Sequence, residues 1–188
     1  MPRPQAANMF FQSKAGFEAV EFYRDQRTDH CGRSRVEILK QSYDWLESKH
    51  DFIQWIFPLK EPSAANPHAP ILSEAAVREF QKDPALKERL VISLKIMLGF
   101  YGLELVESGS GSVTVKRLQN FAQRSRCWLT PWNHNFLRIT RILKSLSILG
   151  LPDHARGFLQ CLEGIYPEYR DVISENTFAF WQAAVQEA

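Results

Sequence analysis

The sequence predicts an all-α fold, a single compact multi-helix domain with two long loops. Apolar residues recur with helical spacing in segments that begin at cap residues and end at glycine or proline. A chain of 188 residues that is 45% hydrophobic is long enough to bury a core of its own. Prolines concentrate in residues 57–72, and glycines alternate with serines within residues 103–114, so these two segments are the predicted loops.

The clearest helix is expected at residues 84–101. Asp83 provides an N-cap acceptor before Pro84, whose missing N–H costs nothing in the first turn. Gly102 follows at the position where a left-handed residue commonly ends a helix. From Leu90 onward apolar side chains point in nearly every direction, which predicts a central helix surrounded by other elements.

A second clear helix is expected at residues 135–149, with Asn133 or Asn135 as its cap and Gly150 as its stop. One wide stripe of this helix is apolar, as packing against a core requires. The remaining expected helices cover residues 35–45, 51–56, 73–82, 117–127, 153–165 and 174–185.

The connections are expected to differ in character. Four prolines in residues 57–72 forbid a regular helix and favour an extended, ordered path over the surface. Residues 103–114 are compatible with either a short hairpin or a flexible loop. Residues 1–16 lack the continuous apolar run of a signal peptide and are expected to form a flexible N-terminal tail, which leaves residues 17–188 as the domain.

Cysteine usage and hydropathy predict a soluble cytoplasmic protein. The three cysteines are an odd and scattered set, which is typical of reduced thiols rather than of a secreted disulfide scaffold. The most apolar stretch, residues 90–101, is interrupted by Lys95 and is much shorter than the ~20 residues of a membrane span. No integral membrane span is therefore expected.

The net charge of +2 conceals a strongly basic segment. Residues 108–152 contain no Asp or Glu but hold seven cations: Lys116, Arg117, Arg124, Arg126, Arg138, Arg141 and Lys144. Such asymmetry creates a local positive field. One interpretation is an anion-binding face, because guanidinium groups can grip a carboxylate or phosphate with two parallel bonds. The other is internal pairing with the protein's own acids, such as Asp153, Glu163, Glu168 and Asp171.

Three segments resemble the conserved region of the opioid growth factor receptor family. They are residues 43–62 (YDWLESKHDFIQWIFPLKEP), 98–105 (LGFYGLEL) and 134–151 (HNFLRITRILKSLSILGL). The likeness runs in order from about Phe22 to Trp181. It implies a non-enzymatic binding or signalling domain. In animals the family's named member is a receptor without seven membrane spans that binds the pentapeptide methionine enkephalin at the nucleus and its envelope.

Arg138, Arg141 and Lys144 are spaced by three and form a basic stripe on one side of the helix expected at residues 135–149. The resemblance and this basic stripe together suggest a peptide site. We expect an aromatic groove beside the stripe, with the peptide's C-terminal carboxylate on Arg138 or Arg141 and its aromatic side chain among tryptophans. The candidate ligand-binding residues are Arg138, Arg141, Lys144, His134, Trp132, Trp128, Tyr101 and Trp55.

Two other classes of function remain open. Basic residues among aromatics would also suit a nucleic-acid or other polyanion-binding module, although no known binding motif is present. An uncharacterised enzyme is the second alternative, but no catalytic constellation is recognisable, and the sequence predicts no cofactor. His30 and Cys31 lack the second half of a zinc motif, so they are interpreted as part of a turn and no metal site is predicted.

Overall fold

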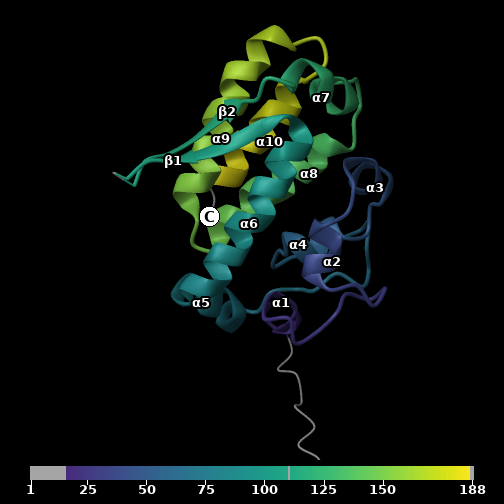
Figure 1. Ribbon diagram of the computed structural model, residues 1–188, viewed down its shortest axis with the longest axis vertical. Coiled ribbons are helices and arrows are strands. Elements are labelled where there is room, and N and C mark those ends of the chain that lie inside the picture. The colour runs from purple at the N-terminus through teal and green to yellow at the C-terminus, as the bar shows by residue number, and fades with distance from the viewer. Residues whose placement is uncertain (1–15, 110, 187–188) are drawn as a thin grey trace, which may run out of the picture.

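The computed structural model describes residues 16–109 and 111–186 (Figure 1). The elements before the hairpin are α1 (Glu18–Tyr23), α2 (Arg35–Leu39), α3 (Tyr43–Ser48), α4 (Ile53–Ile56), α5 (Glu74–Lys82) and α6 (Pro84–Tyr101). They are followed by β1 (Leu103–Glu107), β2 (Val113–Arg117), α7 (Phe121–Trp128), α8 (Asn135–Ile148), α9 (Pro152–Ile165), a 3-10 turn (Tyr166–Glu168) and α10 (Glu175–Gln186). Figure 1 shows α1 and α5 at one end of the long helices and α7 at the other.

Helix α6 has the predicted bounds, and the predicted caps form. The Asp83 carboxylate accepts a hydrogen bond of 2.9 Å from the backbone N–H of Ala85, and Gly102 adopts the left-handed conformation with φ of 77°. The helix contacts α1, α5, α7 and β1, but it is not surrounded on every side, because Ile92 is 44% exposed. It has 18 residues, and within the described chain no helix has both the length and the apolarity needed to cross a bilayer.

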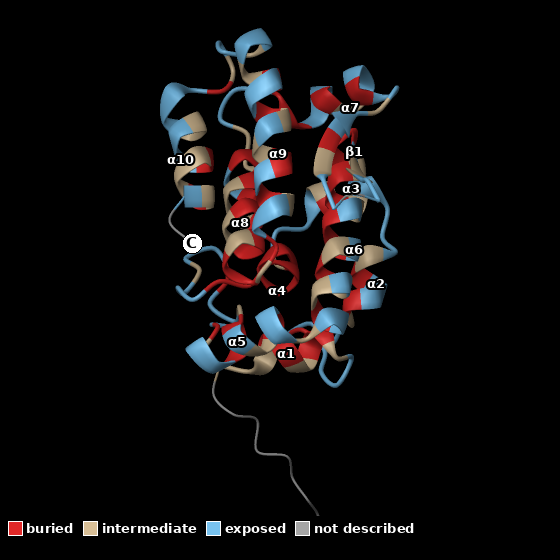
Figure 2. Cartoon of the chain, turned by 90° about the vertical axis from the view of Figure 1, so that its left-hand side faces the viewer, coloured by how far each residue is buried: buried red, intermediate tan, exposed pale blue. Residues whose placement is uncertain are grey.

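Helices α8, α9 and α10 pack against one another on the other side of the molecule. Trp181 of α10 is fully buried, and its indole N–H donates to the Phe136 carbonyl of α8 over 3.1 Å. Figure 2 shows that α8 is largely buried whereas much of α10 faces solvent. Neither candidate cap residue is the N-cap of α8, which is His134, but the Asn133 side-chain oxygen accepts from the N–H of Asn135, the first residue of the helix, at 2.9 Å.

The all-α prediction is wrong, because strands β1 and β2 form a two-stranded antiparallel sheet. Leu105 lies opposite Val115 in the register, and the alternating apolar residues turn one face of the hairpin towards the core. Gly111 in the turn has a φ of 80°, which a glycine adopts without strain. The predicted loop at 103–114 is therefore mostly strand, and the helix expected from residue 117 starts at Phe121 because Arg117 ends β2.

Local capping accounts for another difference from the predicted helices. The helix expected at residues 35–45 is divided into α2 and α3. Ser34 and Glu37 form a capping box at the start of α2, and the Ser42 hydroxyl accepts from the backbone N–H of Trp45 at the start of α3. Two cap signals within nine residues thus produce two short helices. Helix α1 was not predicted.

Residues 57–72 follow an extended path that returns on itself. Leu59 forms a parallel bridge with Ile71, and the N–H of Leu72 donates to the Leu59 carbonyl over 2.9 Å. The carbonyl of Gly16 accepts from the N–H of Ser73 at 3.2 Å, so the first described residue is fixed to the end of this segment. Residues 1–15 of the predicted tail lie outside the described chain.

Gly157 of α9 lies where the hairpin comes closest to the helix. A Cβ at this position would be 2.8 Å from the Val113 carbonyl oxygen. We expect Gly157→Ala to lower the free energy of unfolding by about 1–3 kcal/mol, measured by urea denaturation, because the strand must move away. Gly164 of the same helix is the matched control, since a Cβ there meets nothing within 4 Å. Equal effects of the two substitutions would contradict this close packing.

Candidate functional site

The Arg138 side chain is buried and connects α8 to the end of α3. It is 4% exposed, and its guanidinium donates to the carbonyls of Leu46 at 2.9 Å and Lys49 at 2.5 Å. The last carbonyls of a helix have no partner within the helix and carry partial negative charge, which a cation stabilises. Asn135 lies one turn earlier on α8 and donates to the Glu47 carboxylate at 3.0 Å. Arg138 thus fixes the end of α3 to α8.

The next two turns of α8 hold the start of the proline-rich segment. Arg141 donates to the Phe57 carbonyl at 3.1 Å, and the Ser145 hydroxyl donates to the Pro58 carbonyl at 3.0 Å. Lys144 forms an ion pair with Glu61. Burial lowers the pKa of Arg138 and of Arg141. Each retains its charge at neutral pH, because a guanidinium is not deprotonated in proteins.

A groove of about 390 Å³ lies between α8, α4 and this segment, and we call it the α8 groove. Its polar lining includes His50, Gln54, Glu61, His134, Arg138, Arg141 and Lys144. Its apolar wall includes Ile53, Leu59 and Leu137. The volume falls within the range typical of small-molecule sites, roughly 300–1,000 Å³.

Two histidines meet at one end of the α8 groove. The rings of His50 and His134 are 4.7 Å apart between centroids in an edge-to-face arrangement, and His134 Nε2 lies 3.6 Å from the Glu47 carboxylate. Burial lowers the pKa of His134, and the charge of Arg138 lowers it further. His134 is therefore predominantly neutral at pH 7.

Gln54 contributes an unsatisfied acceptor to the same groove. The residue is 4% exposed, and its amide N–H donates to the His50 carbonyl at 3.1 Å. The amide oxygen is buried and accepts no hydrogen bond within the described part of the chain. A buried acceptor without a donor costs about 1–3 kcal/mol, so a ligand that supplies an N–H or O–H here gains that energy.

The α8 groove brings together four of the eight predicted site residues: Arg138, Arg141, Lys144 and His134. Tyr101 and Trp128 are fully buried in the core, where the Trp128 indole N–H donates to the Tyr101 carbonyl at 3.1 Å. Trp55 is also buried and lines a different pocket. Trp132 is 98% exposed just before α8, with a φ of 60°.

The sequence analysis missed His50, Gln54 and Leu137 of the α8 groove. A usable signal existed for Gln54, because it is a polar residue between Ile53 and Trp55 in an apolar run. Leu137 is an apolar residue between the cations of α8, and it is 75% exposed.

The suggested internal pairing of the basic segment takes a different form from the one anticipated. Arg117 pairs with Glu168 at 2.6 Å, one of the anticipated acids. The α8 cations instead contact backbone carbonyls and Glu61, together with Glu47 at 3.9 Å from Arg138.

Comparison with known proteins identifies the family of this helical domain. A family described as "Opioid growth factor receptor (OGFr) conserved region" matches residues 16–188. The opioid growth factor receptors of Rattus norvegicus and Homo sapiens are each 49% identical over 136 residues, covering 70% of this chain. The opioid growth factor receptor-like protein 1 of Xenopus tropicalis is 40% identical over 111 residues, or 59% of this chain.

The chain belongs to the opioid growth factor receptor family, and its resemblance to the family is thereby confirmed. The aligned part spans only 23%, 20% and 21% of the rat, human and frog relatives, respectively. No solved structure matches the chain significantly.

The role of Arg138 can be tested without removing its charge. We expect Arg138→Lys to lower the free energy of unfolding by about 3 kcal/mol, because the single ammonium group of lysine cannot replace a guanidinium that donates to the carbonyls of both Leu46 and Lys49. The measurement is chemical denaturation. Arg126→Lys on the exposed face of α7 is the control and is expected to change stability by less than about 0.5 kcal/mol. A tolerated Arg138→Lys would show that charge alone suffices.

Proposed function

We propose that this chain is a non-enzymatic binding module that takes a short peptide with a free C-terminal carboxylate into the α8 groove. The observation that carries the proposal is that one groove contains both an unsatisfied buried acceptor, Gln54, and a guanidinium, Arg141, whose hydrogen-bond partner in the fold is an uncharged carbonyl. The relatives are named receptors for an opioid growth factor. The family's ligand class, methionine enkephalin, is a peptide of this kind.

Arg141 is the residue assigned to the carboxylate. It donates one N–H to the Phe57 carbonyl and lines the α8 groove, so donors remain on its planar fork. Arg138 is assigned a positioning role instead, because its guanidinium is committed to α3. This division sharpens the sequence-based choice between Arg138 and Arg141.

The Gln54 oxygen is assigned to a peptide N–H. Peptide backbones offer such donors at every residue except proline. A ligand that placed its carboxylate on Arg141 and an N–H on Gln54 would satisfy both polar groups of the groove at once. Anions without a donor, such as a phosphodiester, would leave the Gln54 oxygen unsatisfied.

Exposed apolar surface next to the groove suits a hydrophobic peptide side chain. Leu137 lines the groove and is 75% exposed, and Trp132, two residues before His134, presents a nearly free indole. Tryptophan is enriched at binding hot spots because it offers a large, rigid contact area. Trp132 replaces the buried Trp128 and Tyr101 as the aromatic contact in this proposal.

Polyanion binding is the weaker alternative because the fold already uses most cations of the basic segment. Arg117, Arg138, Arg141 and Lys144 have the partners described above, and Arg124 donates to the Phe100 carbonyl at 2.8 Å. Within the described chain this leaves Lys116 and Arg126 without such a partner, and Arg141 with donors that its carbonyl partner does not use. Three such cations provide little of the salt-dependent affinity that nucleic-acid binding requires.

The carboxylate assignment is tested with methionine enkephalin and its C-terminally amidated form. We expect the acid to bind about 10- to 100-fold more tightly by calorimetry, because a hydrogen bond to a charged group contributes about 1.5–3 kcal/mol. Arg141→Gln is expected to abolish this preference, whereas Arg126→Gln, outside the groove, is expected to keep it. Equal affinity of the intact protein for both forms would refute the assignment.

Trp132→Gly tests the proposed contact between the Trp132 indole and the peptide without destabilising the fold. Glycine accepts a φ of 60° without strain, so we expect the free energy of unfolding to stay constant or to rise by up to about 1 kcal/mol. The affinity for methionine enkephalin is expected to fall severalfold as the indole contact is lost. A variant that binds like the original protein would exclude Trp132 from the site.

A further inference from the structure

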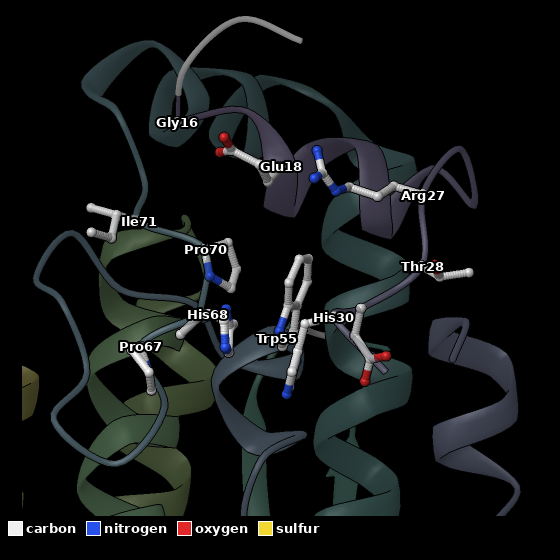
Figure 3. Close-up of a pocket in the computed structure, with 12 residues that line it drawn as sticks. Gly16, Glu18, Arg27, Thr28, His30, Trp55, Pro67, His68, Pro70 and Ile71 are labelled. Carbon is white, nitrogen blue, oxygen red and sulfur yellow. The ribbon is translucent and has the colours of Figure 1, made fainter. Parts of the chain in front are cut away.

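A second pocket, of about 420 Å³, lies between α1 and the loops at residues 27–31 and 67–71, and we call it the α1 pocket. Figure 3 shows His30, His68 and Trp55 gathered in it. The imidazole of His30 stacks on that of His68, with 5.2 Å between centroids and 18° between planes. The same His30 ring stacks on the indole of Trp55, with 6.4 Å between ring centroids and 17° between ring planes. The His30 ring is therefore held in a defined place.

Cys31 and Asp51 extend the His30 position into a three-residue cluster. The Cys31 Sγ lies 3.5 Å from Asp51 Oδ2, and His30 Nε2 lies 3.8 Å from the same oxygen. The ligand atoms of Asp29, His30 and Cys31 lie within 4.8 Å of one another. In a tetrahedral zinc site the bond lengths place sulfur and oxygen ligands about 3.5 Å apart and nitrogen and oxygen ligands about 3.3 Å apart. The distance from Cys31 to Asp51 thus matches that of a coordinated ion, and the 3.8 Å from His30 to Asp51 is longer.

The surrounding groups keep these side chains in position. The buried carboxylate of Asp29 accepts from the backbone N–H groups of Cys31 at 2.9 Å and Arg33 at 2.8 Å, which fixes the loop that carries His30. The Arg33 guanidinium pairs with Asp29 at 2.6 Å and with Asp51 Oδ1 at 3.0 Å. Oδ2 of Asp51 is therefore left to face His30 and Cys31. Partners that orient the ligands in this way are a regular part of metal sites.

We propose that His30, Cys31 and Asp51 bind a zinc ion through imidazole nitrogen, thiolate sulfur and carboxylate oxygen, with water in the fourth position. Nitrogen and sulfur ligands select zinc over calcium and magnesium, which prefer all-oxygen sites. The thiolate and the carboxylate balance the two charges of the ion. Asp29 belongs to the same cluster but acts as support, since its oxygens already accept hydrogen bonds from Cys31 and Arg33.

Binding releases one proton, because the Cys31 thiol must lose it to become a ligand. The affinity for the metal is therefore expected to fall as the pH falls, by about tenfold per pH unit for a single proton.

The test uses the full 188-residue chain and Co²⁺, which replaces zinc in tetrahedral sites and absorbs through thiolate-to-metal charge transfer. We expect one Co²⁺ per chain, a charge-transfer band, and loss of the band when Zn²⁺ is added. Cys31→Ser is expected to abolish the band. Asp51→Asn is expected to lower the affinity by about tenfold or more, since changes outside the ligand set alone cost that much.

Cys127→Ser is the matched control, because Cys127 is the other exposed cysteine in the described chain and lies outside the cluster. It is expected to keep the band. His30→Gln provides a second ligand variant, and circular dichroism establishes that each variant is folded. The proposal is overturned if the intact protein shows no charge-transfer band, or if the band survives Cys31→Ser.

Discussion

The guanidinium of Arg138 joins two parts of the chain that are 88 or more residues apart, as measured by its contacts with His50, Lys49 and Leu46. A buried charge is costly unless it is fully hydrogen-bonded, and α3 supplies the carbonyls that its own backbone leaves free. The ring of Phe52 lies 5.5 Å from the same guanidinium and adds a cation–π contact. Arg138 therefore fixes the end of α3 to α8, and the contacts of Arg141 and Ser145 with Phe57 and Pro58 complete the wall of the α8 groove.

The choice of partners determines the electrostatics of the groove. A backbone carbonyl accepts the hydrogen bond of Arg141 without cancelling its charge. Arg138 also donates to backbone carbonyls, and its ion pair with the Glu47 carboxylate is long, at 3.9 Å. Lys144 shows the contrast, because Glu61 pairs with it directly. The positive field that the sequence indicated thus persists in the folded protein, although its cations are not free at the surface.

Elements that depend on interactions between residues close in sequence could be predicted, whereas elements that depend on contacts between distant segments could not be predicted in full. Helix α6 could be predicted with its bounds because Asp83, Pro84 and Gly102 act within a few residues of its ends. The hairpin was only one of two possibilities for residues 103–114, because its strands have five residues each and are stabilised by packing on α9, where Gly157 leaves room for the strand. The basic stripe of α8 was visible in its spacing of three. Its partners and the contribution of Gln54 to the groove arise from segments that are distant in sequence.

Residues 57–72 contribute to the lining of both the α8 groove and the α1 pocket. Leu59 and Glu61 line the α8 groove, whereas Pro67 and Ile71 line the α1 pocket, and the bridge between Leu59 and Ile71 ties the two stretches together. The two cavities therefore share a wall. A ligand that shifts this wall in one cavity changes the affinity of the other, and thermodynamic linkage makes the effect equal in both directions. The proline-rich segment is the physical route by which the two cavities can act on each other.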